Sequence, residues 1–296
     1  MLKKIINKLF RIEEWILAYS KATTDEFFRS KGKVLEKHHT ISNNAFSFFA
    51  DPFLVKIKNN KAYLFVENYS FFMGGRIAFL EVDLNNNFFK QKIIISGGHY
   101  SFPFFFKKKN KFIIFPEMSQ KNTNLIFYIK NNQIVKKEPF FNKFILIDPV
   151  ITIHNKLYWL FCSKKGNDEN RALYVFYSKD LKKWTNINNN SPAINNSRNC
   201  RSGGNIIKYK DFLYRPAQNC FLNYGKSLNI NQIKNLRKNK YVEKKVFTIH
   251  PFNSDSFNQG IHHISLNNNY IFFDKKRYKY TPFKLIYKIF RLINFL

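Results

Sequence analysis

The chain of 296 residues is 45% hydrophobic and 18% aromatic, so it has enough apolar material for one large all-β domain or two ordinary domains. Its formal net charge of +31 indicates either an anionic partner or lysine that serves mainly solubility, and both alternatives stay open. No helix-turn-helix, RNP or zinc-finger pattern is present, which argues against nucleic acid as the partner. The three cysteines form no CxxC pair, which favours a reducing compartment.

The first segment, residues 1–20, has the periodicity of an amphipathic helix, with isoleucine and leucine on one face and lysine on another. It has no uninterrupted apolar stretch and no small-residue cleavage site, so we expect no signal peptide and a cytoplasmic location. Residues 281–296 repeat the amphipathic pattern. Both ends therefore either pack on the rest of the chain or lie on an anionic membrane surface, which would make the protein peripheral at the inner membrane.

Between the two ends, short apolar segments of about five to seven residues follow one another, as expected of β-strands. Turns rich in lysine and asparagine, such as residues 58–60 and 131–132, separate them. Residues 225–245 break the pattern, and we expect a helix or an excursion between repeats there. No linker rich in proline and glycine is present, so we expect a single domain over residues 1–296 with its strand-rich part at about 40–275.

Five segments of the strand-rich part look like copies of one another. Each places a polar residue at the start of a short apolar strand, and these residues are Asp51, Ser101, Asp148, Arg201 and His262. The intervals between them are 50, 47, 53 and 61 residues. A repeat of about 50 residues that holds several short strands is typical of a propeller blade. The sequence therefore predicts an all-β protein, a five-bladed β-propeller with short amphipathic helices at its termini.

The second strand of each repeat also ends on a polar residue, and these are Glu67, Glu117, Ser163, Gln218 and Asp274. Because the second strand of a blade runs back beside the first, both polar positions should lie on one rim of the propeller. Carboxylates close together push their pKa values apart, which suits general acid–base chemistry. Arg201 and Arg215 are expected to hold an anionic group or sugar hydroxyls. No HxH or HExxH spacing is present, so we expect no metal and no other cofactor.

Several motifs resemble those of a known family. They are Trp-Ile-Leu-Ala-Tyr at residues 15–19, Ala-Asp-Pro-Phe-Leu at 50–54, His-Tyr-Ser-Phe-Pro at 99–103, Tyr-Arg-Pro-Ala-Gln-Asn-Cys at 214–220 with Tyr-Gly at 224–225, and Gly-Ile-His-His at 260–263. Over roughly residues 15–275 the chain resembles the N-terminal domain family of the glucosamine inositolphosphorylceramide transferases. It departs from the family pattern at Asn219, where an aspartate is usual, and this puts an acid role at that position in doubt.

The resemblance implies a five-bladed propeller like that of the furanosidase-type glycoside hydrolases. Those enzymes carry three channel carboxylates in successive blades, which act as a base or nucleophile, as a stabiliser of the transition state or tuner of pKa, and as an acid. By position Asp51 looks like the carboxylate of the first blade, and Glu117 and Asp148 are the candidates for the other two. The separate glycosyltransferase domain of the plant proteins has no counterpart in this chain, so the resemblance does not carry over that activity.

We therefore predict a carbohydrate-active protein that cleaves or transfers a surface-glycan or lipid-linked sugar in polysaccharide or glycolipid biosynthesis. The expected chemistry lies with Asp51, Glu117 and Asp148. The residues expected to position the sugar are Glu67, His99, Ser101, Arg201, Arg215, Gln218, Tyr224, His262 and Asp274. One alternative is a non-catalytic glycan-binding protein that assists glycosyltransferases, and another is a scaffold held on anionic lipid by its positive charge.

Overall fold

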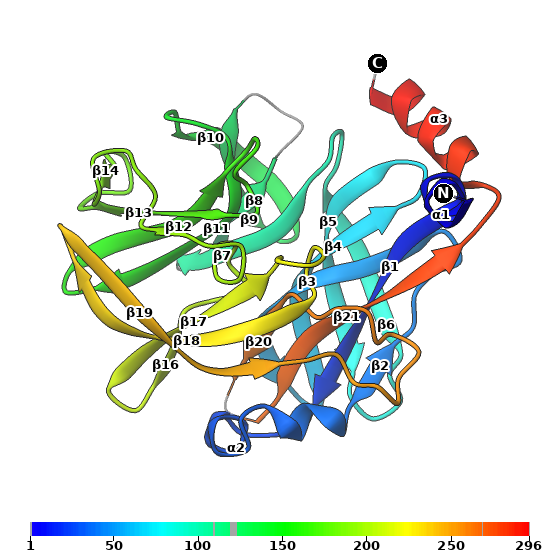
Figure 1. Ribbon diagram of the computed structural model, residues 1–296, viewed down its shortest axis with the longest axis horizontal. Helices are drawn as coiled ribbons and strands as arrows, with labels where there is room; N and C mark the ends of the chain where they lie inside the picture. The colour runs from blue at the N-terminus through cyan, green and yellow to red at the C-terminus, as the bar shows by residue number, and fades with distance from the viewer. Residues whose placement is uncertain (1, 109, 119–122, 268, 296) are drawn as a thin grey trace.

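Five antiparallel sheets stand around a common axis and give the chain its architecture (Figure 1). The computed structural model describes residues 2–295 except 109, 119–122 and 268. The first sheet holds β3 (Ser47–Lys58), β4 (Lys61–Ser70), β5 (Gly74–Asp83) and β6 (Phe89–Ile95). The second holds β7 (Ser101–Lys108), β8 (Lys111–Glu117), β9 (Asn124–Lys130) and β10 (Gln133–Phe141). The third holds β11 (Leu146–His154), β12 (Leu157–Lys164), β13 (Ala172–Ser178), β14 (Thr185–Asn186) and β15 (Ile194–Asn195). The fourth holds β16 (Ile207–Tyr209), β17 (Phe212–Asn219), β18 (Ser227–Arg237) and β19 (Lys240–Ile249).

The fifth sheet joins the two ends of the chain. Its strands, in order, are β2 (His39–Ile41), β1 (Arg11–Ser20), β21 (Ile271–Tyr280) and β20 (Ile264–Leu266). β1 pairs with β21 along all ten of its residues, so hydrogen bonds between the N-terminal and C-terminal parts close the ring. The five-bladed all-β propeller predicted from the repeat is confirmed.

The prediction of a helix over residues 1–20 is correct only for α1 (Leu2–Phe10), because the rest of that segment is β1. Leu17 and Ala18 point to opposite faces of β1, and both are fully buried. A strand buried on both faces is an unbroken apolar run, which periodicity alone does not distinguish from a helix. The ring of blades therefore begins at Arg11 rather than near residue 40.

The prediction of a helix or an excursion at residues 225–245 is wrong, since β18 and β19 are the outer strands of the fourth blade. The long last interval of the repeat comes from the connection between β19 and β20, residues 250–263. Asn229 and Asn231 are buried on β18 and hydrogen-bonded there, the first to Arg198 O at 2.8 Å and the second to Glu243 at 2.9 Å. Because these amides take the place of apolar residues, a strand buried on both faces does not look like an apolar run in the sequence.

The remaining helices are short. α2 (Thr24–Arg29) and η1 (Lys33–Glu36) connect β1 to β2, and α3 (Lys284–Phe295) follows β21, in agreement with the helix predicted at the C-terminus. The two terminal helices, α1 and α3, lie beside each other at one edge of the propeller (Figure 1). None of the helices in the described part of the chain is long and apolar enough to cross a membrane.

Phenylalanine fills the space between neighbouring blades. Phe65 on β4 contacts Phe79 in its own blade and Phe105 and Phe112 in the next, with ring centroids 5.1 to 5.4 Å apart. Edge-on contacts of this kind pack large rings densely without stacking them face to face. Phenylalanines of the first three blades thus belong to one continuous core cluster, which joins those blades behind the channel residues.

Candidate functional site

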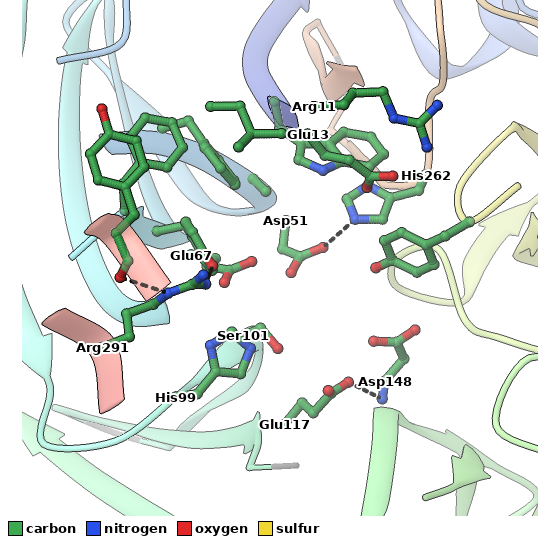
Figure 2. Close-up of a pocket in the computed structure, with 18 of the residues that line it drawn as sticks. Arg11, Glu13, Asp51, Glu67, His99, Ser101, Glu117, Asp148, His262 and Arg291 are labelled. Atoms are coloured by element: carbon green, nitrogen blue, oxygen red, sulfur yellow. Dashed lines mark hydrogen bonds and ion pairs between the residues drawn. The ribbon is translucent and has the colours of Figure 1, made fainter. Parts of the chain in front are cut away.

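A pocket of about 410 Å³ lies at the end of the channel where the first strands begin and the second strands end (Figure 2). Nine predicted residues line it, namely Asp51, Glu67, His99, Ser101, Glu117, Asp148, Arg201, Tyr224 and His262. Strand pairing explains why they meet, since Ser101 lies opposite Glu117 and Ala50 lies opposite Glu67. Segments of all five blades thus bring polar side chains to one rim, as the repeat predicted.

Asp51 and Asp148 share an unusual backbone position. Each precedes a proline, lies at a bulge in the pairing of the first two strands, and has a positive φ, +51° and +46° respectively. Phe102, with a φ of +48°, occupies this position in the second blade, so the repeat that placed Ser101 there is one residue out of register. A positive φ is strained for a residue with a side chain, and bulges of this kind occur where a side chain must be re-aimed.

Backbone N–H groups at these bulges link the carboxylates of neighbouring blades. The N–H of Asp51 donates to Asp274 at 3.0 Å, and the N–H of Phe102 donates to Asp51 at 3.0 Å. The N–H of Asp148 donates to Glu117 at 3.2 Å. Each carboxylate is therefore oriented by the blade that follows it around the channel.

Glu117 and Asp148 share one cation. Arg201 donates through Nε to Asp148 at 2.6 Å and through Nη2 to Glu117 at 3.3 Å. Gln218 donates to the same oxygen of Asp148 at 2.8 Å. Burial and then the charge of Asp148 raise the pKa of Glu117 to about 8, although Arg201 opposes the shift. Glu117 is thus mostly protonated at neutral pH, and Asp148 is an acceptor fixed by two donors.

His262 lies between two other carboxylates. Its Nδ1 is 2.8 Å from an oxygen of Asp274, its Nε2 is 3.6 Å from Asp51 Oδ1, and Trp15 stacks on its ring with centroids 3.8 Å apart. Burial raises the pKa of Asp51 to about 7, with His262 opposing and Asp274 adding to the shift. Burial alone would raise the pKa of Asp274, but the charge and hydrogen bond of His262 outweigh it and the pKa is lowered. Asp51 therefore changes its charge near neutral pH.

Glu67 and His99 form the side of the pocket next to Arg291 (Figure 2). Burial, with the neighbouring carboxylates, raises the pKa of Glu67 well above its usual range. The N–H of Gly75 donates to His99 Nδ1 at 2.9 Å, which puts the ring proton on Nε2. Burial and the nearby Arg291 lower the pKa of His99 to about 4, so its ring is a neutral donor. A Cβ at Gly75 would lie 2.5 Å from Glu67 Oε1, so only glycine fits.

Three predicted residues lie behind the pocket rather than in it. Gln218 and Asp274 are fully buried and support Asp148 and His262. Arg215 does not reach the pocket, and the prediction that it holds a ligand there is wrong. Its fully buried guanidinium donates to Glu243 at 2.8 and 2.9 Å and is held inside the fourth blade.

Sequence reasoning missed the wall that comes from the chain ends. Arg11 and Trp15 line the pocket from β1, and Lys284, Tyr287 and Arg291 line it from α3. Trp15 belongs to the motif at residues 15–19, so that motif could have marked it. Nothing in the sequence separates the three residues of α3 from ordinary polar positions on a surface helix.

The triad of Asp51, His262 and Asp274 is also the group of donors, among the described residues, that could hold a metal ion, with donor atoms within 4.8 Å of one another. The oxygens of Asp274 already accept bonds from the backbone of Asp51, His262 and His263. A cation at this place would therefore meet mainly Asp51 and Nε2 of His262, on the side of the pocket.

The fold is that of the five-bladed propellers found among carbohydrate-active enzymes. One similar solved structure is the α-L-arabinofuranosidase PaAbf62A from Podospora anserina, with a TM-score of 0.56, 9% identity and coverage of 77% of this chain and 81% of that one. Another is CoXyl43, a β-xylosidase/α-arabinofuranosidase from a compost metagenome, with a TM-score of 0.54, 11% identity and coverage of 80% and 92%. At such identities the likeness establishes the fold.

Residues 34–275 match the family described as glucosamine inositolphosphorylceramide transferase 1, N-terminal, and the chain belongs to that family, as its motifs predicted. It is 30% identical to glucosamine inositolphosphorylceramide transferase 1 of Arabidopsis thaliana over 230 residues, which are 72% of this chain and 28% of that protein. The protein of the same name from Oryza sativa subsp. japonica is 27% identical over 226 residues, or 68% and 28%. The chain thus spans little more than a quarter of the length of these relatives.

Proposed function

We propose that the channel pocket binds a surface-glycan or lipid-linked sugar and cleaves or transfers its glycosidic bond. The observation that carries this proposal is the convergence of Asp51, Glu117 and Asp148, from three successive blades, on one pocket. Glycosidic chemistry needs a carboxylic acid on one side of the bond and a carboxylate on the other. Two of the three carboxyl groups have pKa values raised to about 7 and about 8, which is the range in which general acids and bases work.

In the proposed reaction Glu117 gives its proton to the leaving oxygen as the bond from the anomeric carbon to that oxygen breaks. Asp51, in its ionised form, takes a proton from the water or sugar hydroxyl that attacks the anomeric carbon. Asp148 holds the proton on Glu117, because its own charge raises the pKa of that neighbour. Arg201 keeps Asp148 in place through the bond at 2.6 Å.

The rest of the pocket fits a sugar. Trp15 and Tyr224 supply aromatic surface next to His262, with Trp15 stacked on the imidazole and Tyr224 edge-on to it at 5.3 Å. His99 offers a neutral N–H donor, and Glu67 offers a carboxyl group that accepts or donates according to its protonation. Hydroxyl groups recognised by such donors and acceptors, over an apolar ring face, are the usual features of sugar recognition.

Membership of the family supports a role in polysaccharide or glycolipid biosynthesis. The relatives are named glucosamine inositolphosphorylceramide transferases, and the chain corresponds to only 28% of their length. The alternative is a propeller that binds the sugar and presents it to a glycosyltransferase without reacting itself. Both functions use the same pocket, so the deciding observation is turnover.

The test is a screen of glycans and sugar nucleotides with the wild type, Asp51→Asn and Glu117→Gln, reading both binding and product. We expect turnover to fall by about 100-fold or more in each variant while binding persists. Turnover requires Asp51 ionised and Glu117 protonated, so its rate should be highest between about pH 7 and about pH 8. Binding that is equal in all three proteins, with no product from any, would establish the presenting protein instead.

A further inference from the structure

The two terminal helices carry an apolar surface that faces away from the propeller. We call it the terminal apolar face, and it consists of Ile5, Ile6 and Leu9 of α1 with Ile286, Ile289 and Ile293 of α3. These side chains are between 37% and 63% exposed. Exposed apolar side chains gathered on two neighbouring helices mark a site of interaction.

The orientation of α3 is the reverse of that usual for a helix on a soluble protein, which turns its apolar stripe toward the core. Lys284, Tyr287 and Arg291 follow one another at intervals of three and four residues, are the less exposed residues of the helix, and line the pocket. Arg291 donates to the hydroxyl of Tyr69, and Lys284 donates to the backbone carbonyl of Lys8 at 2.7 Å. The polar stripe is therefore fixed inward by these contacts, and the apolar stripe is left outward.

The apolar face continues onto the neighbouring blade. The ring of Phe72 packs on the exposed Phe290 of α3 at 5.6 Å and on Phe46 at 5.6 Å. Phe46 and Met73 are themselves largely exposed. Both lie at the rim where β3 begins and β4 ends, which is the end of the propeller that holds the pocket. The exposed apolar surface and the pocket thus share one side of the molecule.

The charge of the same region selects the partner. Residues 1–12 and 281–296 contain no aspartate or glutamate, and lysine and arginine flank the apolar positions in both segments. Arg11, Lys284 and Arg291 are also part of the pocket wall. Helices with an apolar stripe and only positive charge are those that lie in the interface of an anionic bilayer.

We propose that the terminal apolar face docks on an anionic bilayer, and that the pocket takes its sugar as the head group of a lipid in that bilayer. The binding of a lipid head group in the pocket rests on the proposed function, whereas the docking on the bilayer does not. Docking through the outer side of α3 places its inner side, and with it the pocket, at the level of the head groups. The cations of the pocket wall then suit a phosphate that links sugar to lipid, while the buried carboxyls suit the sugar.

Sedimentation with vesicles tests the docking. The wild type should bind vesicles of phosphatidylcholine with about 30% phosphatidylglycerol, bind pure phosphatidylcholine far less, and be released by salt. Ile286→Glu combined with Ile289→Glu should weaken binding by at least about tenfold. The matched control is Ile153→Glu, which changes an isoleucine that is 60% exposed near the opposite end of β11 and should bind like the wild type. The docking would be overturned if the double variant bound the vesicles as well as the wild type does, or if the wild type formed dimers and did not bind vesicles.

A second measurement tests whether the pocket binds the head group of a lipid. Trp15 lines the pocket, so its fluorescence should change when sugar binds. We expect a larger change with a lipid that bears a glucosyl phosphate head group, in phosphatidylglycerol vesicles, than with glucose 1-phosphate in solution. Equal responses to the two forms would refute the head-group assignment. Docking without a response of Trp15 to either form would leave the bilayer contact standing and count against the proposed glycan function. Asp51→Asn should dock like the wild type, because Asp51 is buried away from the terminal apolar face.

Discussion

Replacing Arg201 with methionine tests the electrostatics of the pocket directly. Arg201 is buried and is bonded to two buried carboxyl groups, those of Asp148 and Glu117. Methionine keeps much of the length of the side chain but removes its charge and its donors. Removal of one partner from a buried ion pair costs roughly 3–5 kcal/mol, so a loss of that size in the free energy of unfolding is expected at neutral pH.

The loss should grow in alkaline solution. The pKa of Glu117 in the folded protein is about 8, already above its value in the unfolded chain, even though Arg201 lowers it. A raised pKa in the folded state means that stability is lost as the pH rises through that pKa. Without Arg201 the pKa of Glu117 is higher still. The free energy of unfolding of the wild type stops falling on this account above about pH 8, whereas that of the variant continues to fall by about 1.4 kcal/mol per pH unit.

Urea denaturation followed by tryptophan fluorescence measures the loss of stability at about pH 7 and its increase at about pH 9.5. The titration of surface lysines affects the two proteins equally and cancels in the difference. Arg29→Met is the control, since the side chain of Arg29 is 78% exposed and its pair with Asp25 should contribute less than about 1 kcal/mol. A deficit that is the same at both pH values, or a variant as stable as the wild type, would refute this account of the pocket.

Three further outcomes are expected. Gly75→Ala should lower the free energy of unfolding by roughly 1–3 kcal/mol in thermal melts, because the new Cβ would lie 2.5 Å from Glu67 and 2.6 Å from a backbone carbonyl. Glu67→Gln should stabilise the fold at about pH 8 and leave it unchanged at about pH 4, since burial raises the pKa of Glu67 and ionisation opposes folding. In urea titrations, a difference in the free energy of unfolding between Glu67→Gln and the wild type that is the same at both pH values would contradict this argument. Asp274→Asn should lower the pKa of His262 in an NMR titration, because burial lowers that pKa and the charge of Asp274 is the largest effect that raises it.

The Asp-Pro steps at residues 51–52 and 148–149 were recognisable in the sequence because each stands directly before an apolar strand at a recurring interval. The strand ends at Glu67 and Glu117 were recognisable for the same reason. Phe102 was not, since it holds the same bulge without a polar side chain, and Ser101 beside it took its place in the pattern. A repeat found by residue type therefore locates the blades but can miss the register within one of them.

The parts that the sequence concealed depend on partners far along the chain. β1 was expected to be helical because its pairing with β21, more than 250 residues away, has no local signature. Arg215 was expected in the pocket because its motif lies on β17, but Gln218 and Arg215 are three residues apart and so project from opposite faces of the strand. The contribution of α3 to the pocket wall could not be predicted either, since it depends on how the helix turns after β21.

The distribution of acidic residues bears on the choice between a reacting and a presenting propeller. The chain has 50 basic residues and only 19 acidic ones, yet Asp51, Glu67, Glu117, Asp148 and Asp274 are all buried around one channel. Buried carboxyl groups destabilise a fold unless they are paired, and Arg201 is the one arginine or lysine that the described structure pairs with any of these five. A site that only binds sugar could take its donor from an amide, and it has no need of a glutamic acid that keeps its proton up to about pH 8. A site that must give a proton to a leaving oxygen needs such a group, and this asymmetry favours the enzyme over the presenting protein.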